Sequence, residues 1–169
     1  RRNPAWGTTA FTLMELPDKA KPGAWSESYK DKIAQARIEA VRYEKITEGI
    51  KTAKAKALRN RYTLQVYEQT NNLQNYPVRL ILALNAYDTA KDEAAQKIAL
   101  SEVAEVCDYF DAMRANLESV YSETRFMQQP EGFVSDLNHH NHLSSKTYNS
   151  DWWYYYEIPM VRKVRAWMK

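Results

Sequence analysis

The segment from Ser26 to Gln128 carries apolar residues every three or four positions, and this spacing restricts the chain to a helical fold. Three apolar stripes can be followed along it. The first runs through Tyr29, Ile33, Ala36, Ala40, Tyr43, Ile46, Ile50, Ala53 and Ala57, the second through Tyr62, Val66, Gln69, Leu73, Leu80, Leu84 and Tyr87, and the third through Ile98, Val103, Val106, Phe110, Met113, Leu117 and Tyr121. An isolated helix cannot bury so many apolar positions, so the stripes predict an all-α bundle.

Few residues indicate where the first predicted helix ends and the second begins. No glycine or proline occurs between Ile50 and Tyr76, so one very long helix reaching to Gln74 is a second arrangement that the residues allow. We favour a turn near Asn60, because three helices of comparable length, about 30–35 residues each, then run up, down and up. The predicted fold is therefore a three-helix or long-helix antiparallel bundle.

Residues near the expected helix ends refine this prediction. Ser26, with Glu27 behind it, is the predicted N-cap of the first helix. Asp92 and Glu93 give the last helix an acidic start, which suits the positive end of the helix dipole. Pro77 is expected to kink or interrupt the helix that contains it.

The two ends of the chain differ from the middle. Residues 1–25 hold three of the six prolines and two of the four glycines, and they predict an irregular N-terminal strap. Residues 26–128 form the predicted bundle. Residues 129–169 are rich in histidine and aromatic side chains and are expected to pack on the bundle as a tail. A final short helix is predicted over Met160–Lys169, with a proline near its start.

The counts of particular residue types exclude several classes of protein. The single cysteine, Cys107, excludes an internal disulfide framework and any cysteine-cluster metal site, and it is interpreted as a small buried hydrophobe. The longest apolar run, Leu80–Leu84, has five residues, far short of the roughly 18 that a membrane span needs. The chain opens at Arg1 rather than methionine, so we interpret it as a piece of a longer protein.

The charges are distributed unevenly along the predicted helices. Basic residues gather in Lys51–Arg61 and again in Arg162–Lys169, although the net charge is only +3. The third predicted helix carries eight acidic residues and three basic ones. Opposite charges on neighbouring helices help them to dock and stay in solution. We therefore predict no binding of nucleic acid.

All three histidines lie within four positions, at His139, His140 and His142. Imidazole is a common metal ligand, but a structural zinc site usually takes four ligands from two separated places. Adjacent side chains in an extended loop also point in opposite directions. We predict a hydrogen-bonded loop that packs the tail on the bundle, and no bound metal.

An aromatic block is the most unusual part of the sequence. Its members are Tyr148, Trp152, Trp153, Tyr154, Tyr155 and Tyr156. Such rings pack cores and interfaces, and they also stack on sugar faces. The candidate ligand or interface residues are those of this block and its surroundings: His139, His140, His142, Asp151, Trp152, Trp153, Tyr155 and Glu157. The sequence holds no phosphate-binding loop, nucleophile elbow or kinase motif, so no catalytic residue and no cofactor is assigned.

Several strings resemble a known family. They are YSETRFMQQPEGF at 121–133, DLNHHNHL at 136–143, YNSDWW at 148–153 and RNRYTLQVYEQ at 59–69. Together they resemble the region C-terminal to the catalytic barrel in Bacteroidetes-type proteins of glycoside hydrolase family 20, which are β-N-acetylhexosaminidase-like. The family's Asp-Glu catalytic pair follows a His-x-Gly-Gly-type string, whereas the one Asp-Glu dipeptide here, Asp92-Glu93, follows Ala90-Lys91.

The resemblance therefore implies a noncatalytic C-terminal accessory domain of a periplasmic or secreted glycan-degrading hydrolase, which supports the catalytic domain or an interface. Two alternatives stay open: a carbohydrate-binding module that uses the tail aromatics, and a helical protein-interaction or self-association domain. The expected partners are accordingly a catalytic domain of the same parent chain, a glycan, or a second copy of the chain.

Overall fold

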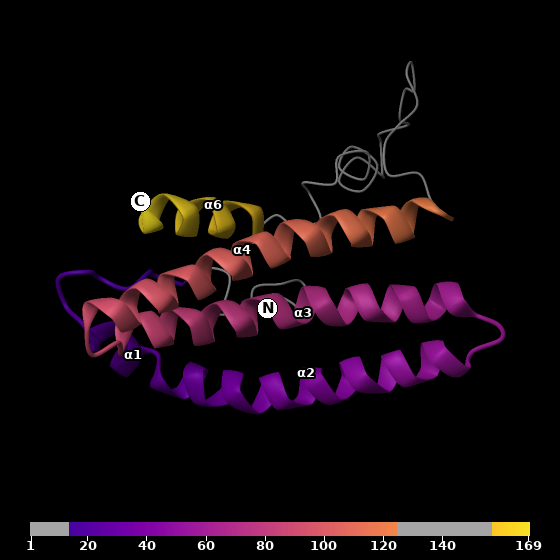
Figure 1. Cartoon of the computed structure of the whole chain (residues 1–169), viewed down its shortest axis with the longest axis horizontal. Coiled ribbons are helices and arrows are strands. Elements are labelled where there is room, and N and C mark those ends of the chain that lie inside the picture. Colours follow the sequence, from indigo (N-terminus) through magenta and orange to yellow (C-terminus); the bar gives the residue numbers. More distant parts are fainter. Residues whose placement is uncertain (1–13, 125–156) are drawn as a thin grey trace, which may run out of the picture.

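The computed structural model describes residues 14–124 and 157–169, and every regular element in those two ranges is a helix (Figure 1). The helices are α1 (Ala24–Ser28), α2 (Lys30–Lys56), α3 (Arg61–Asp88), α4 (Glu93–Ser122) and α6 (Glu157–Met168). The prediction of an all-α bundle is thus confirmed. The helix predicted near the C-terminus begins a little earlier than the sequence indicated, at Glu157.

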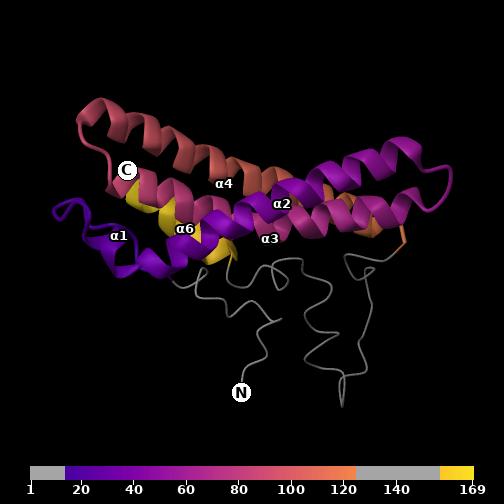
Figure 2. The same cartoon turned by 90° about the horizontal axis from the view of Figure 1, so that it is seen from below.

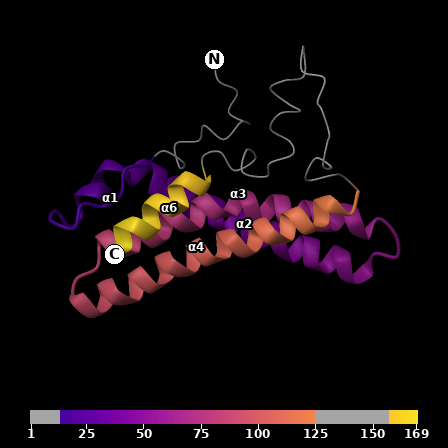
Figure 3. The ribbon, with the colours of Figure 1, turned by 90° about the horizontal axis from the view of Figure 1, so that it is seen from above.

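The three long helices form a row with α3 in the middle. α3 packs extensively against α2 on one side and against α4 on the other (Figures 1 and 2). α2 and α4 run in the same direction and α3 runs back between them, which is the predicted up-down-up order (Figure 1). The shorter α6 lies along α4 (Figure 3). α2 and α4 therefore each turn one side to α3 and another side outward.

The turn between α2 and α3 settles how the first two stripes are divided. Asn60 adopts a left-handed backbone conformation, with φ 58° and ψ 30°, immediately before α3 begins. Asparagine tolerates this conformation better than most residues because its short amide can bond locally. The predicted turn near Asn60 is confirmed, and the single long helix to Gln74 is not formed.

The start of α4 follows the prediction, whereas the start of the first helix does not. The Asp92 carboxylate accepts a hydrogen bond from Ala95 N at 2.8 Å and caps α4. Ser26 lies inside α1, after Gly23, whose φ is 81°. Its backbone N–H donates to Asp88 Oδ2 at 2.8 Å. The prediction of Ser26 as N-cap was wrong because a carboxylate at the far end of α3 supplies the acceptor.

Pro77 lies within α3 without interrupting it. Proline lacks a backbone N–H, so the Leu73 carbonyl loses its usual partner four residues on. The neighbouring residues Tyr76 and Val78 are both buried, so packing on each side keeps the helix continuous here. The predicted interruption does not occur.

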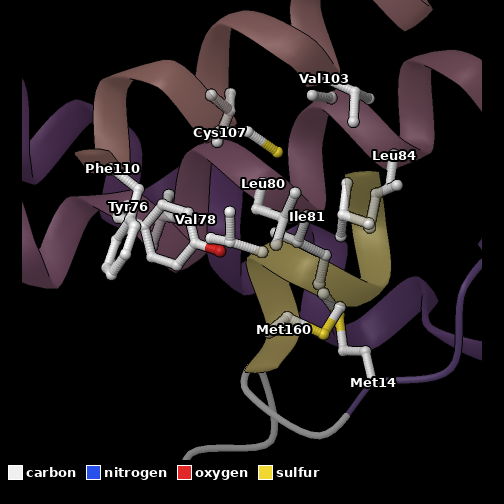
Figure 4. Packing of buried hydrophobic residues seen from close by; sticks show 14 of the residues in the cluster. Met14, Tyr76, Val78, Leu80, Ile81, Leu84, Val103, Cys107, Phe110 and Met160 are labelled. Carbon is white, nitrogen blue, oxygen red and sulfur yellow. The ribbon is translucent and has the colours of Figure 1, made fainter. Parts of the chain in front are cut away.

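The core is densest where α3, α4 and α6 meet. Tyr76 and Phe110 pack with ring centroids 4.9 Å apart, and Leu80 and Cys107 are fully buried beside them (Figure 4). The sulfur-bearing side chains of Met14 and Met160 close one edge of this cluster. Ile98 is a correction to the third stripe, because it stays 64% exposed on the outer side of α4.

The C-terminal helix is bound to the rest of the structure by polar contacts as well as by its apolar side. Arg165 Nη2 donates to Asp108 Oδ1 at 2.9 Å and to Asp111 Oδ2 at 2.7 Å, which joins α6 to α4. Trp167 Nε1 donates to the Pro17 carbonyl at 2.9 Å, which joins α6 to the segment before α1. These contacts raise the pKa of the Arg165 guanidinium, chiefly through the hydrogen bond to Asp111.

We predict that Asp88→Ala lowers the free energy of unfolding by about 1–2 kcal/mol, as the loss of a helix cap does. Asp88 is 3% exposed, and its removal leaves the Ser26 N–H unpaired at the start of α1. Urea denaturation measures the change. Asp88→Asn keeps an acceptor oxygen and should lose less, while Glu48→Ala, at an exposed carboxylate, should stay within about 0.5 kcal/mol. Equal losses for Asp88→Ala and Glu48→Ala would contradict the capping role.

Candidate interaction face

Most of the site residues predicted from the sequence lie outside the described ranges. These are His139, His140, His142, Asp151, Trp152, Trp153 and Tyr155. The predictions of a histidine loop and of an aromatic ligand surface therefore stay predictions.

Glu157 is the one candidate that the structure places. It is half-buried and lies in the first turn of α6. A carboxylate at this position is stabilised by the positive end of the helix dipole. Glu157 lies at the edge of the core near Tyr76. The pKa of the Tyr76 hydroxyl is raised mainly by burial and less by the Glu157 carboxylate.

The described residues hold neither a metal-binding cluster nor an activated thiol. Within residues 14–124 and 157–169, no three His, Cys, Asp or Glu side chains gather closely enough to hold a metal ion. Cys107 is fully buried, and burial raises the pKa of its thiol to about 11. A thiol with so high a pKa is not an activated nucleophile at neutral pH. Cys107 is therefore a packing residue, as the sequence predicted.

In the described part of the chain, no helix combines enough length with enough apolar character to cross a bilayer.

The surface that the sequence reasoning missed is the outward side of α2. We call it the α2 outer face, and it consists of Ile38, Val41, Arg42, Lys45 and Ile46, which line a shallow, solvent-open hollow of about 640 Å³. Ile38 is 64% exposed and Val41 51% exposed. Residues at these spacings share one side of a helix. Ile46, which the sequence placed on the first apolar stripe, is instead more than one-third exposed and borders this hollow.

The opposite side of α2 explains why this face stays outside. Ile33 and Ala36 are buried on the side that packs toward the core, and Tyr43 packs against it. Thr47 Oγ1 accepts a hydrogen bond from Asn71 Nδ2 of α3 at 2.9 Å. Because this side of α2 is fixed on α3, rotation of the helix cannot hide Ile38 or Val41. The outer face is thus a consequence of the row arrangement.

Further polar contacts hold the three long helices together. Lys54 Nζ lies 2.6 Å from Glu68 Oε2, and both side chains are about one-third exposed. Tyr109 of α4 donates its hydroxyl to the Asn72 carbonyl at 3.2 Å, while the Arg79 guanidinium lies over its ring at 4.1 Å from the centroid. These polar contacts fix the spacing of the three helices, so the α2 outer face is presented on a rigid support.

The α2 outer face carries two cations, Arg42 and Lys45. Arg42 pairs with Glu39 on its own helix at 3.4 Å. Lys45 forms no ion pair with any of the described residues. Apolar side chains bordered by cations favour contact with an apolar surface that carries carboxylates.

Comparison with known proteins identifies no relative: no family model, curated protein or solved structure matches this chain. The resemblance to glycoside hydrolase family 20 therefore remains a prediction from the four strings quoted above. Two of these, at 136–143 and 148–153, lie wholly outside the described ranges.

We predict that Cys107 does not react with a disulfide reagent such as dithionitrobenzoate at pH 8 while the protein is folded. It should react once per chain after unfolding in guanidinium. The same burial makes stability depend on alkaline pH: the unfolded thiol ionises near pH 9 and the folded one near pH 11, so unfolding becomes more favourable between these values. Rapid labelling of the native protein, with no change in circular dichroism, would contradict this assignment.

Proposed function

We propose that this chain is a noncatalytic helical interaction module and that the α2 outer face is the surface through which it binds another protein. One observation carries the proposal: Ile38, Val41 and Ile46 are exposed together around one hollow, with Arg42 and Lys45 at its border. Single exposed apolar residues are common on soluble proteins, but apolar side chains grouped around a hollow and rimmed by charge are typical of contact surfaces.

The mechanism of binding follows from the composition of the face. Covering Ile38 and Val41 removes apolar surface from water, which contributes roughly 25 cal/mol for each Å² buried. The flanking cations stay at the rim, where they select an acidic partner and steer its approach more than they add affinity. Because α2 is already fixed on α3, little ordering is needed on binding, which lowers the entropic cost.

The family resemblance supports a more specific form of this proposal. We place the module in a glycan-degrading hydrolase of the β-N-acetylhexosaminidase-like type, in the periplasm or outside the cell, as an accessory domain beside the catalytic domain. A rigid row of helices that carries a contact surface suits such a role. The alternative of glycan binding rests on tail aromatics outside the described ranges, so no feature of the described surface favours it.

We predict that the α2 outer face is covered in the cell. Hydroxyl-radical footprinting of intact cells that make the protein should label Ile38, Val41 and Ile46 several-fold less than the purified chain at high dilution. Tyr67, which is 59% exposed on α3, is the matched control and should be labelled equally in both samples. Equal labelling of Ile38 in the two samples would overturn the proposed contact surface.

We also predict that the purified chain does not hydrolyse an aryl N-acetylglucosaminide, because the sequence supplies no acid pair of the family type. Released aryl alcohol, followed by absorbance, measures the rate against a buffer blank. Contamination by a host enzyme is controlled by a parallel preparation from cells without the gene. Turnover that disappears on mutation of the chain's own residues would show that the module is catalytic.

A further inference from the structure

The outer side of α4 carries a second exposed surface with the opposite charge. We call it the α4 outer face, and it consists of Ala94, Ile98, Ser101, Glu102 and Glu105, all of which are exposed. Ile98 is 64% exposed, the same fraction as Ile38. Neither Glu102 nor Glu105 forms an ion pair within the described part of the chain. The face is therefore an apolar centre bordered by unpaired acids.

The two outer faces share one sequence spacing. On α2, the isoleucine is followed by cations four and seven positions later, at Arg42 and Lys45. On α4, Ile98 is followed by carboxylates four and seven positions later, at Glu102 and Glu105. Residues separated by four and seven lie on the same side of a helix. If the two helices lie side by side in the same direction with their isoleucines in contact, each cation meets a carboxylate.

The fold supplies the direction that this match requires. α2 and α4 run the same way, and α3 lies between them (Figures 1 and 2). One chain therefore cannot bring its own two faces together. A second copy in the same orientation has an α4 that points the same way as the first copy's α2.

We infer that the α2 outer face binds the α4 outer face of a second copy of this chain, in parallel, with Ile38 against Ile98, Arg42 facing Glu102 and Lys45 facing Glu105. This inference rests on the proposed function, since it names the partner of the same surface. Charge complementarity selects this pairing. Two α2 outer faces would bring Arg42 and Lys45 of each copy together, and two α4 outer faces would bring carboxylates together, and both like-charged arrangements are unfavourable.

The pairing is head-to-tail, and this determines the kind of assembly. After one contact forms, one α2 outer face and one α4 outer face remain open at the two ends. Such a contact continues into an open chain unless the rotation between copies closes a ring. The expected particles are therefore a series of sizes that grows with protein concentration. Because the charged residues are exposed, high salt should shift the series back toward the monomer.

The test uses the purified 169-residue chain and its charge-reversal variants. Sedimentation velocity over a range of concentrations should show a weight-average mass that rises past that of a dimer. Lys45→Glu and Glu105→Lys should each weaken association by about tenfold, because each places like charges opposite one another. Mixing the two variants should restore association, since the carboxylate introduced at position 45 of one chain then faces the ammonium introduced at position 105 of the other. Mixing Lys45→Glu with Glu102→Lys should restore less, because those positions are one turn out of register.

The matched control is Lys51→Glu. Lys51 lies on α2 six positions after Lys45, on another side of the helix, and its side chain is 75% exposed. This variant makes the same change in net charge and should leave association unchanged. Circular dichroism confirms that each variant keeps its helix content.

Each result of the experiment decides the inference. Growth past the dimer, loss in both single variants and rescue in the mixture support it. A mass that stays at the monomer, or that stops at the dimer and ignores Glu105→Lys, overturns it. A monomer whose α2 outer face is nevertheless protected in the cell overturns only the identity of the partner, and the proposed interaction function then stands. A monomer without that protection overturns both.

Discussion

The burial of α3 between its two neighbours determines the rest of this structure. Its C-terminal half is buried around most of its circumference, as the consecutive burial of Leu80 and Ile81 and of Ala83 and Leu84 shows. A helix in that position must be covered on several sides, and α2, α4 and α6 provide the cover. Each covering helix can use only one side for this. The outward sides of α2 and α4 are thus left to solvent or to a partner by the architecture itself.

The two ends of the row are held together by different interactions. Near α1 and α6 the helices meet through a dense apolar core and through contacts such as that of Arg165 with Asp108 and Asp111. Toward Asn60, the contacts between α2 and α3 are more polar, as in the pairs of Lys54 with Glu68 and of Thr47 with Asn71. Polar contacts fix geometry but contribute less to stability than apolar burial does. The α1 end is therefore expected to be the more stable part of the fold.

Much of the fold could be predicted from the sequence, since helical spacing is a local property. The three long helices, the turn at Asn60 and the acidic start of α4 at Asp92 all followed from residues within a few positions of each feature. The errors share one cause. The Ser26 N–H donates to Asp88, 62 positions away, and Ile98 fits a helical stripe yet stays largely exposed. Periodicity shows which residues share a side of a helix, but not which helix covers that side.

The same reasoning explains why the candidate surface was missed. The sequence analysis selected histidines and aromatic residues, because their side chains can bind ligands wherever they occur in a fold. The α2 outer face uses ordinary residues whose significance depends on being left uncovered, and that is known only once α3 is placed on the other side. Stacking an α4 outer face on it would give α2 a second neighbour, as α3 already has. Ile38 and Ile98 would then both be buried, as the periodicity of the third stripe predicts for Ile98.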